Sequence, residues 1–428
     1  MRSDAAVPVA VVGGGFSGVM TAVQLARHGV PVRLFDGGER PGRGVAYGTR
    51  DEHHLLNVPA AKMSAFPHDP DHFRAWGELD AGEFARRCDY GRYLDDIRAE
   101  HPGVTLEPMS VAAIERAGDG YLMHLADGGS VEAAGVVLAL GNEAPAIPRG
   151  WEGIDLLANP WSPDAAARLR EAAAGNGDIL LIGTGLTMVD LVLSLTGLGF
   201  EGRMIAVSRR GLLPRAHGPA EPAPVLLEDV PQRDLMALWR WLRRRSAEVD
   251  YRAAVDSLRP HTGTLWQSLS LEQRRRFLCH ARPWWDVHRH RIAPQVSAQL
   301  RDLIAAGRLE IIAGRLARAD GGELLVSKRG GGERRIAPML AVNCTGPLGD
   351  VRASANPLLR QLLADGLAGP DPLNLGLQAD EQDRVGEHMW AVGPLTKGMY
   401  WEMVAVPDIR HQAERVALAI SKELAAHG

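Results

Sequence analysis

An apolar run followed by three spaced glycines near residue 10 constrains the fold of this chain more than any other feature. Residues 9–12 (VAVV) indicate a buried strand, and Gly13, Gly15 and Gly18 then fill a G-x-G-x-x-G pattern. Residues at helical spacing follow as far as Gly29. The first glycine of such a pattern permits a tight turn, the second lets a pyrophosphate approach the backbone, and the third lets helix and strand pack closely. The phosphates then lie at the helix N-terminus, where free N–H groups favour anions.

The segment after this helix completes the unit. A second strand, PVRLFD, ends at Asp36, and an acidic residue at this place can accept hydrogen bonds from ribose hydroxyls. A lone glycine pattern is weak evidence, but strand, helix and acidic end together predict a dinucleotide-binding unit. The combination disfavours the alternative of a glycine-rich turn without a ligand.

The same pattern recurs in the middle of the chain. A predicted strand at 179–182 is followed by Gly183, Gly185 and a predicted helix through Leu195. The third glycine position holds Met188, which loosens the closest helix–strand contact, and we interpret this as a variant nucleotide site. The candidate nucleotide-binding residues of this turn are Gly183, Gly185, Leu186 and Thr187.

The strand that follows the second pattern ends in Ser208, Arg209 and Arg210 instead of an acid. Arginine at this place pairs with a 2′-phosphate, so the sequence predicts NADP(H) over NAD(H). A solvated basic turn is the alternative. Two complete units predict two dinucleotides, and the usual arrangement is a flavin on one unit and a nicotinamide on the other.

The 428 residues exceed what one hydrophobic core usually serves, so we expect at least two domains. Two similar segments, GVVLALGN and MLAVNCTGP, indicate crossings between them. The predicted fold class is α/β, with two Rossmann-like dinucleotide-binding domains, the nicotinamide domain being inserted into a split FAD domain. The expected bounds are 1–150 and 338–428 for the FAD domain, 151–337 for the NADP domain, and about 212–307 for a mostly helical insertion within the latter.

Composition excludes some classes of function. The net charge is −4, with 48 basic and 52 acidic residues, which argues against a dedicated nucleic-acid binder. Three cysteines lie far apart and form no C-x-x-C, so neither a zinc knuckle nor a redox-active dithiol is indicated, and no metal site is expected. No signal region and no membrane-spanning apolar run is evident. We expect a cytoplasmic protein with a small-molecule substrate and no nucleic-acid or membrane partner, and the oligomeric state stays open.

The stretch RPWWDVHRHR, residues 282–291, is unlike any other part of the chain. Prolines at 283 and 294 suit helix starts, so we expect a short helix at 284–292. His288 and His290 face different sides of it, which disfavours a shared metal, whereas Asp286 and His290 share a face and predict a buried acid–histidine pair. One interpretation is a wall of the cleft between the two nucleotide domains, and the other is a structural packing cluster. In the first, the candidates for contact with NADPH phosphates or an anionic substrate are Arg282, His288, Arg289 and Arg291.

Other polar residues are open to two interpretations. His53 and His54 are either near the flavin or, more commonly for such residues, solvated in a turn. Cys344 is either near a cofactor or a buried structural cysteine. Lys397 and Tyr400 either border the flavin, oriented by Glu402, or form a surface group.

Several stretches carry a family likeness: GGGFSGVM, GRGVAYGT, LLNVPAAKMSAFP, YGRYL, GTGLTMVD, RPWWDVHRHR and VGPLTKGMYWEMVAVPDIR. On these the chain resembles the two-dinucleotide-binding-domain flavoproteins, and within them the YdhS-like FAD/NAD(P)-binding proteins. More distantly it is similar to the class B flavin monooxygenases, including N-hydroxylases. Met188 departs from the pattern, as does Asp36, where many such proteins have glutamate.

The resemblance implies FAD at the first glycine turn and NADPH at the second. It also implies that the isoalloxazine ring lies by the start of the last helix, near Val406–Ile409, where the helix N-terminus stabilises negative charge on the reduced flavin. Asp408 in that first turn is expected to point outward and cap the helix. The other candidate cofactor-binding residues, outside the second glycine turn and its strand, are Gly13, Gly15, Phe16, Ser17, Gly18, Asp36, Arg43, Gly44, Asn57, Val58, Gly141, Gly346, Gly393, Pro394 and Pro407.

The expected activity is that of an FAD- and NADPH-dependent oxidoreductase. Family analogy favours a monooxygenase that hydroxylates nitrogen or sulfur of a small molecule through a flavin hydroperoxide. A flavoprotein reductase or dehydrogenase without oxygen insertion is the first alternative, and a non-catalytic nucleotide-binding scaffold is the second. The sequence assigns no catalytic side chain.

Overall fold

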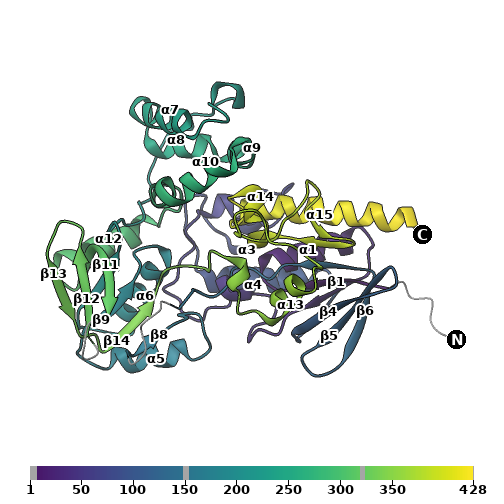
Figure 1. Cartoon of the computed structure of the whole chain (residues 1–428), viewed down its shortest axis with the longest axis horizontal. Coiled ribbons are helices and arrows are strands. Elements are labelled where there is room, and N and C mark those ends of the chain that lie inside the picture. Colours follow the sequence, from purple (N-terminus) through teal and green to yellow (C-terminus); the bar gives the residue numbers. More distant parts are fainter. Residues whose placement is uncertain (1–6, 148–153, 319–322, 428) are drawn as a thin grey trace.

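The computed structural model describes residues 7–147, 154–318 and 323–427. The described chain forms two parallel-stranded units and a separate group of helices (Figure 1). The strands of the first unit lie at one end of the molecule and those of the second at the other, and the helices α7–α10 project from the side between them (Figure 1). The α/β fold class predicted from the two glycine patterns is confirmed.

The first sheet has the strand order β15-β16-β7-β1-β2-β3. Its central strand β1 (Val9–Val12) pairs in parallel with β2 (Val32–Phe35) and β7 (Gly135–Leu138). All four residues of β1 are buried, as expected for a parallel strand covered on both faces. The helices α1 (Phe16–Arg27) and α15 (Val406–His427) pack against each other on one face.

The opposite face of the first sheet is covered by a small antiparallel sheet and by α13, which share a core with it. The remaining elements of this unit are α2 (Gly44–Tyr47), η1 (Ala60–Lys62), α3 (His72–Gly77), α4 (Arg87–Ala99), β3 (Val104–Glu107), β4 (Val111–Ala117), β5 (Gly120–Leu125), β6 (Ser130–Ala133), η6 (Val351–Ala353), α13 (Pro357–Ala364), β15 (Arg384–Gly386), β16 (Met389–Ala391), η7 (Gly393–Thr396) and α14 (Lys397–Tyr400).

The second sheet has the order β13-β12-β11-β10-β9-β14-β8. It places β9 (Ile179–Ile182) between β10 (Met204–Ser208) and β14 (Leu340–Asn343), both parallel to it. Its other elements are β8 (Leu156–Leu157), α5 (Ala165–Ala173), α6 (Leu186–Gly197), α12 (Pro294–Ala305), β11 (Leu309–Arg318), β12 (Leu324–Lys328) and β13 (Glu333–Ile336).

Two expected bounds differ from this arrangement. The strand β14 was expected to open the second part of the FAD domain, yet it pairs with β9 inside the second sheet, so we propose that the chain returns to the first unit after Asn343. The helix α12 was assigned to the insertion, but it buries Val296, Leu300 and Leu303 in the core of the second unit. The other proposed boundary, at 150–151, lies outside the described residues.

The helical insertion has its own apolar core, which includes Trp266, Phe277 and Trp285 and which Trp401 of the first unit joins. Its elements are η2 (Leu227–Asp229), α7 (Leu235–Glu248), α8 (Tyr251–Ser257), η3 (Arg259–His261), α9 (Thr262–Ser268), α10 (Leu271–Arg276), a π-helix η4 (Phe277–Ala281) and α11 (Arg282–Arg289). Among the described helices, none combines the length and apolar character that a bilayer crossing requires.

Candidate functional site

The first glycine turn leaves no room for side chains. Gly13 has φ of +107°, and a Cβ atom there would lie 2.3 Å from the carbonyl oxygen of Ala139. A Cβ atom on Gly18 would lie 1.8 Å from the carbonyl oxygen of Gly13. The first and third glycines are therefore required by the close approach of β1, β7 and α1, which is the packing expected of a dinucleotide-binding turn.

The segment after β2 lies directly against this turn. A Cβ atom on Gly44 would lie 2.7 Å from the Cα atom of Gly15. The Asp36 carboxylate accepts hydrogen bonds from the backbone N–H groups of Gly38 and Gly42, both at 3.0 Å, and so fixes the 37–42 loop beside the N-terminus of α1. Arg43 is bound to Asp95 of α4 at 2.5 Å. The turn therefore presents bare backbone at the N-terminus of α1, which is the type of surface that binds a pyrophosphate.

The N-termini of α1 and α15 meet at Gly393, at the end of β16. A Cβ atom on Gly393 would lie 2.5 Å from Ser17 Oγ, and its φ of +81° is strained for any side chain. The Gly393 N–H donates to Gln412 Oε1 at 2.8 Å, which ties the turn to α15. Two helix N-termini at one point make the site electropositive, and this suits the phosphates and the reduced ring of a flavin.

Asp408 in the first turn of α15 does not point outward as predicted. It pairs with Arg259 at 3.2 Å and lies 3.9 Å from Arg289, and both arginines belong to the insertion. These two guanidinium groups neutralise the carboxylate, so its charge does not oppose that of a reduced flavin at this helix N-terminus.

The second glycine turn repeats the geometry of the first. Gly183 has φ of +116°, and a Cβ atom there would lie 2.4 Å from the carbonyl oxygen of Cys344, the counterpart of Ala139. Nothing lies within 4 Å of a Cβ atom on Gly185, so the approach to the turn is open. Met188 is fully buried in the core of the second unit. Burial raises the pKa of the Cys344 thiol, so this cysteine stays protonated and structural.

The three residues at the end of β10, where the 2′-phosphate of NADPH is predicted to bind, lie in different environments. Ser208 is turned inward, where its hydroxyl contacts Thr184 Oγ1 at 2.9 Å and accepts a hydrogen bond from the Gly211 N–H at 3.0 Å. Arg209 is exposed and Arg210 is half-buried, and neither has an ion pair within the described part of the chain. Two unpaired guanidinium groups therefore lie where an NADPH 2′-phosphate is expected.

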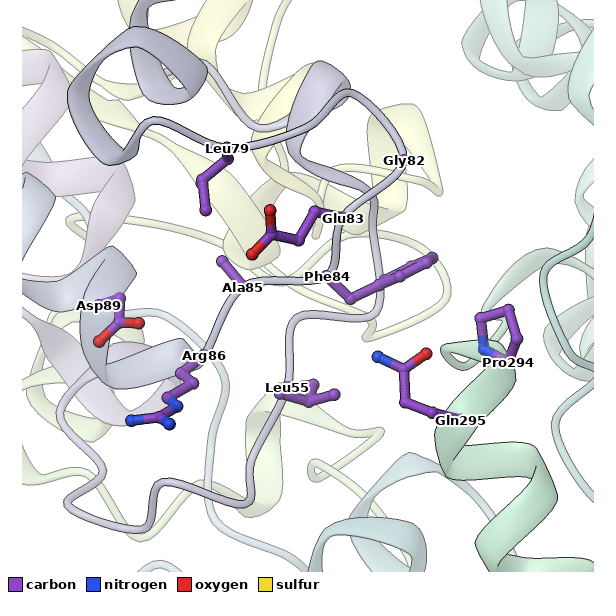
Figure 2. Close-up of a pocket in the computed structure, with 10 residues that line it drawn as sticks. All are labelled: Leu55, Leu79, Gly82, Glu83, Phe84, Ala85, Arg86, Asp89, Pro294 and Gln295. Carbon is purple, nitrogen blue, oxygen red and sulfur yellow. The ribbon is translucent and has the colours of Figure 1, made fainter.

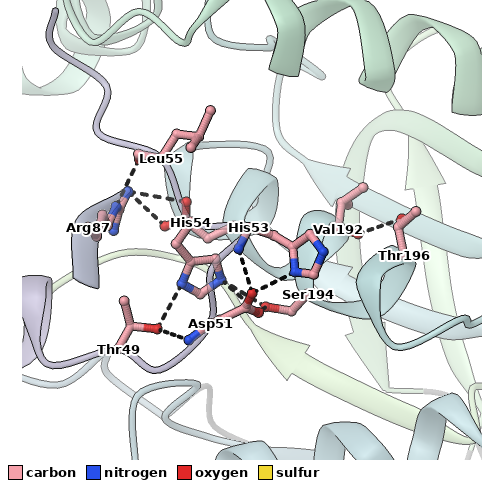
Figure 3. A network of polar contacts seen from close by, with 10 residues as sticks. Thr49, Asp51, His53, His54, Leu55, Arg87, Val192, Ser194 and Thr196 are labelled. Atoms are coloured by element: carbon pink, nitrogen blue, oxygen red, sulfur yellow. Dashed lines mark hydrogen bonds and ion pairs between the residues drawn. The ribbon is translucent and has the colours of Figure 1, made fainter. Parts of the chain in front are cut away.

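A polar network joins the first unit to α6 of the second (Figure 3). The buried His54 contacts Ser194 Oγ at 2.8 Å, and Ser194 donates to Asp51 Oδ2 at 2.5 Å. Arg87 pairs with Asp190 at 3.0 Å and donates to the Leu55 carbonyl at 3.1 Å. Burial lowers the pKa of His54 and raises the pKa of Asp190.

This network was missed by the sequence analysis. The prediction that both histidines are solvated in a turn holds for His53, whose side chain is 58% exposed. It is wrong for His54, whose side chain is 5% exposed. The Asp51, His54 and Ser194 side chains resemble a hydrolytic triad only in composition, because the buried Ser194 donates to the carboxylate and is not activated by the histidine. No spacing in the sequence links residues 140 positions apart.

A cavity of about 450 Å³ lies between the two units, which is within the usual size range of small-molecule sites (Figure 2). Leu55 and Phe84 of the first unit line one side, and Pro294 and Gln295 at the start of α12 line the other. The Glu83 carboxylate also lies on its wall, where it accepts a hydrogen bond from the Asp80 N–H at 3.1 Å.

The 282–291 stretch mostly binds acidic residues of the chain itself. Arg289 is 8% exposed and lies 3.1 Å from Glu402, whose carboxylate also accepts a 2.7 Å hydrogen bond from Trp285 Nε1. Arg291 pairs with Asp256. Burial alone raises the pKa of Glu402, but Arg289 and the nearby histidine outweigh burial and hold that pKa well below its ordinary value.

Two expectations for this region are wrong. Asp286 and His290 are half-buried and 3.8 Å apart, so they do not form the predicted buried pair, and Arg282 binds Asp286 instead at 3.2 Å. Glu402 is neither a surface residue nor the partner of Lys397, because its side chain is buried and pairs with Arg289 of α11. His288 is half-buried and contacts the Trp284 carbonyl at 2.7 Å.

Comparison with known proteins agrees with this geometry. Residues 10–143 match the family described as FAD-NAD(P)-binding. Residues 10–143 are therefore an FAD/NAD(P)-binding domain, and FAD and NADPH are the cofactors that this match supports. No curated protein matches the sequence.

Three solved structures illustrate the fold. The reduced form of ornithine hydroxylase (PvdA) from Pseudomonas aeruginosa has a TM-score of 0.65 at 16% identity, over 98% of this chain and 100% of that one. Bacillithiol disulfide reductase Bdr (YpdA) from Staphylococcus aureus has a TM-score of 0.61 at 11% identity, over 97% and 98%. A mutant flavin monooxygenase from Stenotrophomonas maltophilia has a TM-score of 0.54 at 18% identity, over 98% and 99%.

Proposed function

We propose that the chain is an NADPH-using flavin monooxygenase that hydroxylates nitrogen or sulfur of a small molecule. The observation that supports an FAD- and NADPH-dependent oxidoreductase is the pairing of two glycine turns with the junction of α1 and α15 at Gly393 and with two arginines at the end of β10 that have no ion pair among the described residues. The fold shared with the ornithine hydroxylase favours a monooxygenase. The balanced reaction consumes NADPH, a proton, O2 and the substrate, and yields NADP+, water and the hydroxylated substrate.

The residues of the chain bind and orient the cofactors. The backbone at Gly13 and Gly15 and the N-terminus of α1 hold the FAD pyrophosphate, and the N-terminus of α15 stabilises negative charge on the ring. Arg209 and Arg210 bind the 2′-phosphate of NADPH. When bound, the flavin supplies hydride acceptance and reaction with oxygen, and the protein supplies orientation and electrostatics. The cavity between the units, beside Leu55 and Phe84, is the proposed place for the substrate.

Thiol chemistry on this chain is disfavoured. Its three cysteines lie on α4, in η4 and directly after β14, and all three are free. A dithiol reductase needs two neighbouring cysteines, one of which has a lowered pKa, whereas burial raises the pKa of both Cys88 and Cys344.

A reductase that passes electrons to an acceptor without oxygen insertion is the second candidate. It is favoured by the fold shared with the bacillithiol disulfide reductase, which extends over nearly the whole chain. A non-catalytic scaffold is the third possibility, and cofactor retention tests it.

A stopped-flow experiment separates these functions. The FAD-loaded protein is reduced with NADPH without oxygen and is then mixed with oxygenated buffer. A transient absorbance species between reduced and oxidised flavin supports the monooxygenase, and reoxidation in one step with stoichiometric peroxide supports the reductase. Protein that neither retains FAD nor oxidises NADPH contradicts both proposals.

A further inference from the structure

The helical insertion contains an apolar pocket beneath α7. Leu238 and Trp239 of α7 lie on one side of it, and Leu265 and Trp266 of α9 lie on another. It encloses about 60 Å³. No charged side chain contributes to its wall, and its one polar side chain, Thr262, donates its hydroxyl to the Leu258 carbonyl at 3.1 Å.

An irregular helix forms part of the same wall. Phe277, which lines the pocket, begins the π-helix that joins α10 to α11. A π-turn is rare and is found frequently at functional sites, because the wider turn redirects side chains that a regular helix would place elsewhere.

Trp401 closes the pocket from the side of the first unit. Its backbone has φ of +62° and ψ of −60°, a combination that a bulky residue rarely adopts. Its ring stacks on Trp266 and meets Phe277 edge-on, with centroids 5.0 Å apart in both cases. Its indole Nε1 is buried without a hydrogen-bond partner. Strained residues of this kind are concentrated at ligand sites and switches.

The side chains of the pocket wall hold the segment that lies between Gly393 and α15. Trp266 Nε1 donates to the Gly398 carbonyl at 2.9 Å, and Trp285 Nε1 donates to Glu402 at 2.7 Å. Both tryptophans line the pocket. A molecule in the pocket therefore contacts side chains that fix both ends of residues 398–402.

We propose that this pocket binds a small uncharged apolar molecule or group, either a single ring or a short alkyl chain. A charged group would lose its hydration here. The unpartnered Trp401 Nε1 offsets only part of that loss for a carboxylate, and an amine finds no charged partner on the wall, so both are disfavoured. The enclosed volume is below the roughly 150 Å³ that accommodates benzene in an engineered cavity. Entry therefore requires α7 to shift outward, and Leu238 and Trp239 are only half-buried. This site goes beyond the proposed function and does not depend on it.

The test uses the full-length oxidised protein with FAD and without NADPH, so its outcome is independent of catalysis. 1-Hexanol, hexanoate and hexylamine are titrated while tryptophan emission and Tm are followed. We expect saturable changes with hexanol, and affinities at least tenfold weaker for the two charged probes. Equal responses to all three probes, or no saturable response to hexanol, would overturn the proposal.

Two pocket-filling variants and one control test whether hexanol binds in this pocket. Leu265→Phe fills the space and is expected to weaken hexanol binding at least tenfold, whereas Leu271→Ala changes an exposed leucine of α10 outside the pocket and is the matched control. Leu238→Phe is the second filling variant, because its half-buried position tolerates added volume if Leu265→Phe does not fold. Unchanged hexanol binding in a folded filling variant contradicts the proposal. If the unmodified protein shows no hexanol response and a filling variant raises Tm, the space is a packing void and the proposal is wrong.

Discussion

Arg87 of α4 and Asp190 of α6 form a 3.0 Å ion pair that joins the two nucleotide-binding units. Asp190 is 7% exposed and Arg87 is 16% exposed. The same guanidinium donates to the Leu55 carbonyl, two residues before Asn57 in the segment expected to contact the flavin. Arg87 therefore holds the segment around Leu55 against α6, the helix that follows the second glycine turn.

Arg87→Met is expected to lower the free energy of unfolding by about 3–5 kcal/mol, because it leaves the Asp190 charge buried without a partner. Burial already raises the pKa of Asp190. A raised folded-state pKa gives stability that is present below the unfolded value and is lost as pH rises through the folded value. The loss in Arg87→Met therefore shrinks as the pH is lowered, which urea unfolding at pH 7.5 and 5 measures.

The matched control is Arg86→Met. Arg86 pairs with Glu52, but the two side chains are 51% and 68% exposed, so this change is expected to cost about 1 kcal/mol or less. Equal losses in the two variants would contradict the role given to Arg87.

His217 is expected to make stability depend on pH. Burial lowers its pKa to about 4, and its Nε2 lies 3.0 Å from the Asn57 carbonyl. A lowered histidine pKa gives stability that is present above the unfolded value near 6.5 and is lost as pH falls through about 4. His217→Gln keeps a donor without titrating, so its unfolding free energy should fall less between pH 7 and 5. His53→Gln, at an exposed side chain, should match the unmodified protein.

Replacing Arg209 and Arg210 by glutamine should raise the KM for NADPH by about 10- to 100-fold, since hydrogen bonds to a charged group contribute about 1.5–3 kcal/mol. The KM for NADH, which lacks the 2′-phosphate, should change little. Initial rates of flavin reduction with both nucleotides measure the difference. Equal effects on the two would contradict the assignment of these arginines.

Gly393→Ala should abolish FAD retention, measured as the flavin-to-protein absorbance ratio after gel filtration. Its Cβ atom would collide with Ser17 at the junction of α1 and α15. Gly199→Ala is the matched control, because Gly199, which follows α6, has a similar φ of +80° with nothing within 4 Å of the added atom. Similar FAD loss in both variants would mean that backbone strain, and not the collision, is responsible.

Arg289→Ala tests the 282–291 stretch. It leaves the buried Glu402 without its arginine, with only the Trp285 hydrogen bond and His290 at 3.8 Å, so a stability loss of about 3–5 kcal/mol is expected. Unchanged NADPH and substrate kinetics in the folded variant would favour the structural cluster over a ligand contact. Arg282→Ala is the comparison, because Arg282 is 42% exposed and its loss should cost about 1 kcal/mol or less.

The local patterns in the sequence predicted the parts of the fold that depend on neighbouring residues. Strand, glycine turn, helix and acidic strand end follow one another along the chain, and each follows from backbone sterics or hydrophobic periodicity. For that reason Gly13 and Gly183 were identified together with their roles.

Only the tertiary structure decided which distant groups meet. Arg87 and Asp190 are 103 positions apart, and Trp285 and Glu402 are 117 apart, so no spacing could pair them. Burial, which shifts the pKa values of His54 and Asp190, likewise depends on how the two units pack. The sequence by itself therefore determined two nucleotide-binding units and their turns, whereas the placement of charges between them required the packed chain, because desolvation and pairing act through space.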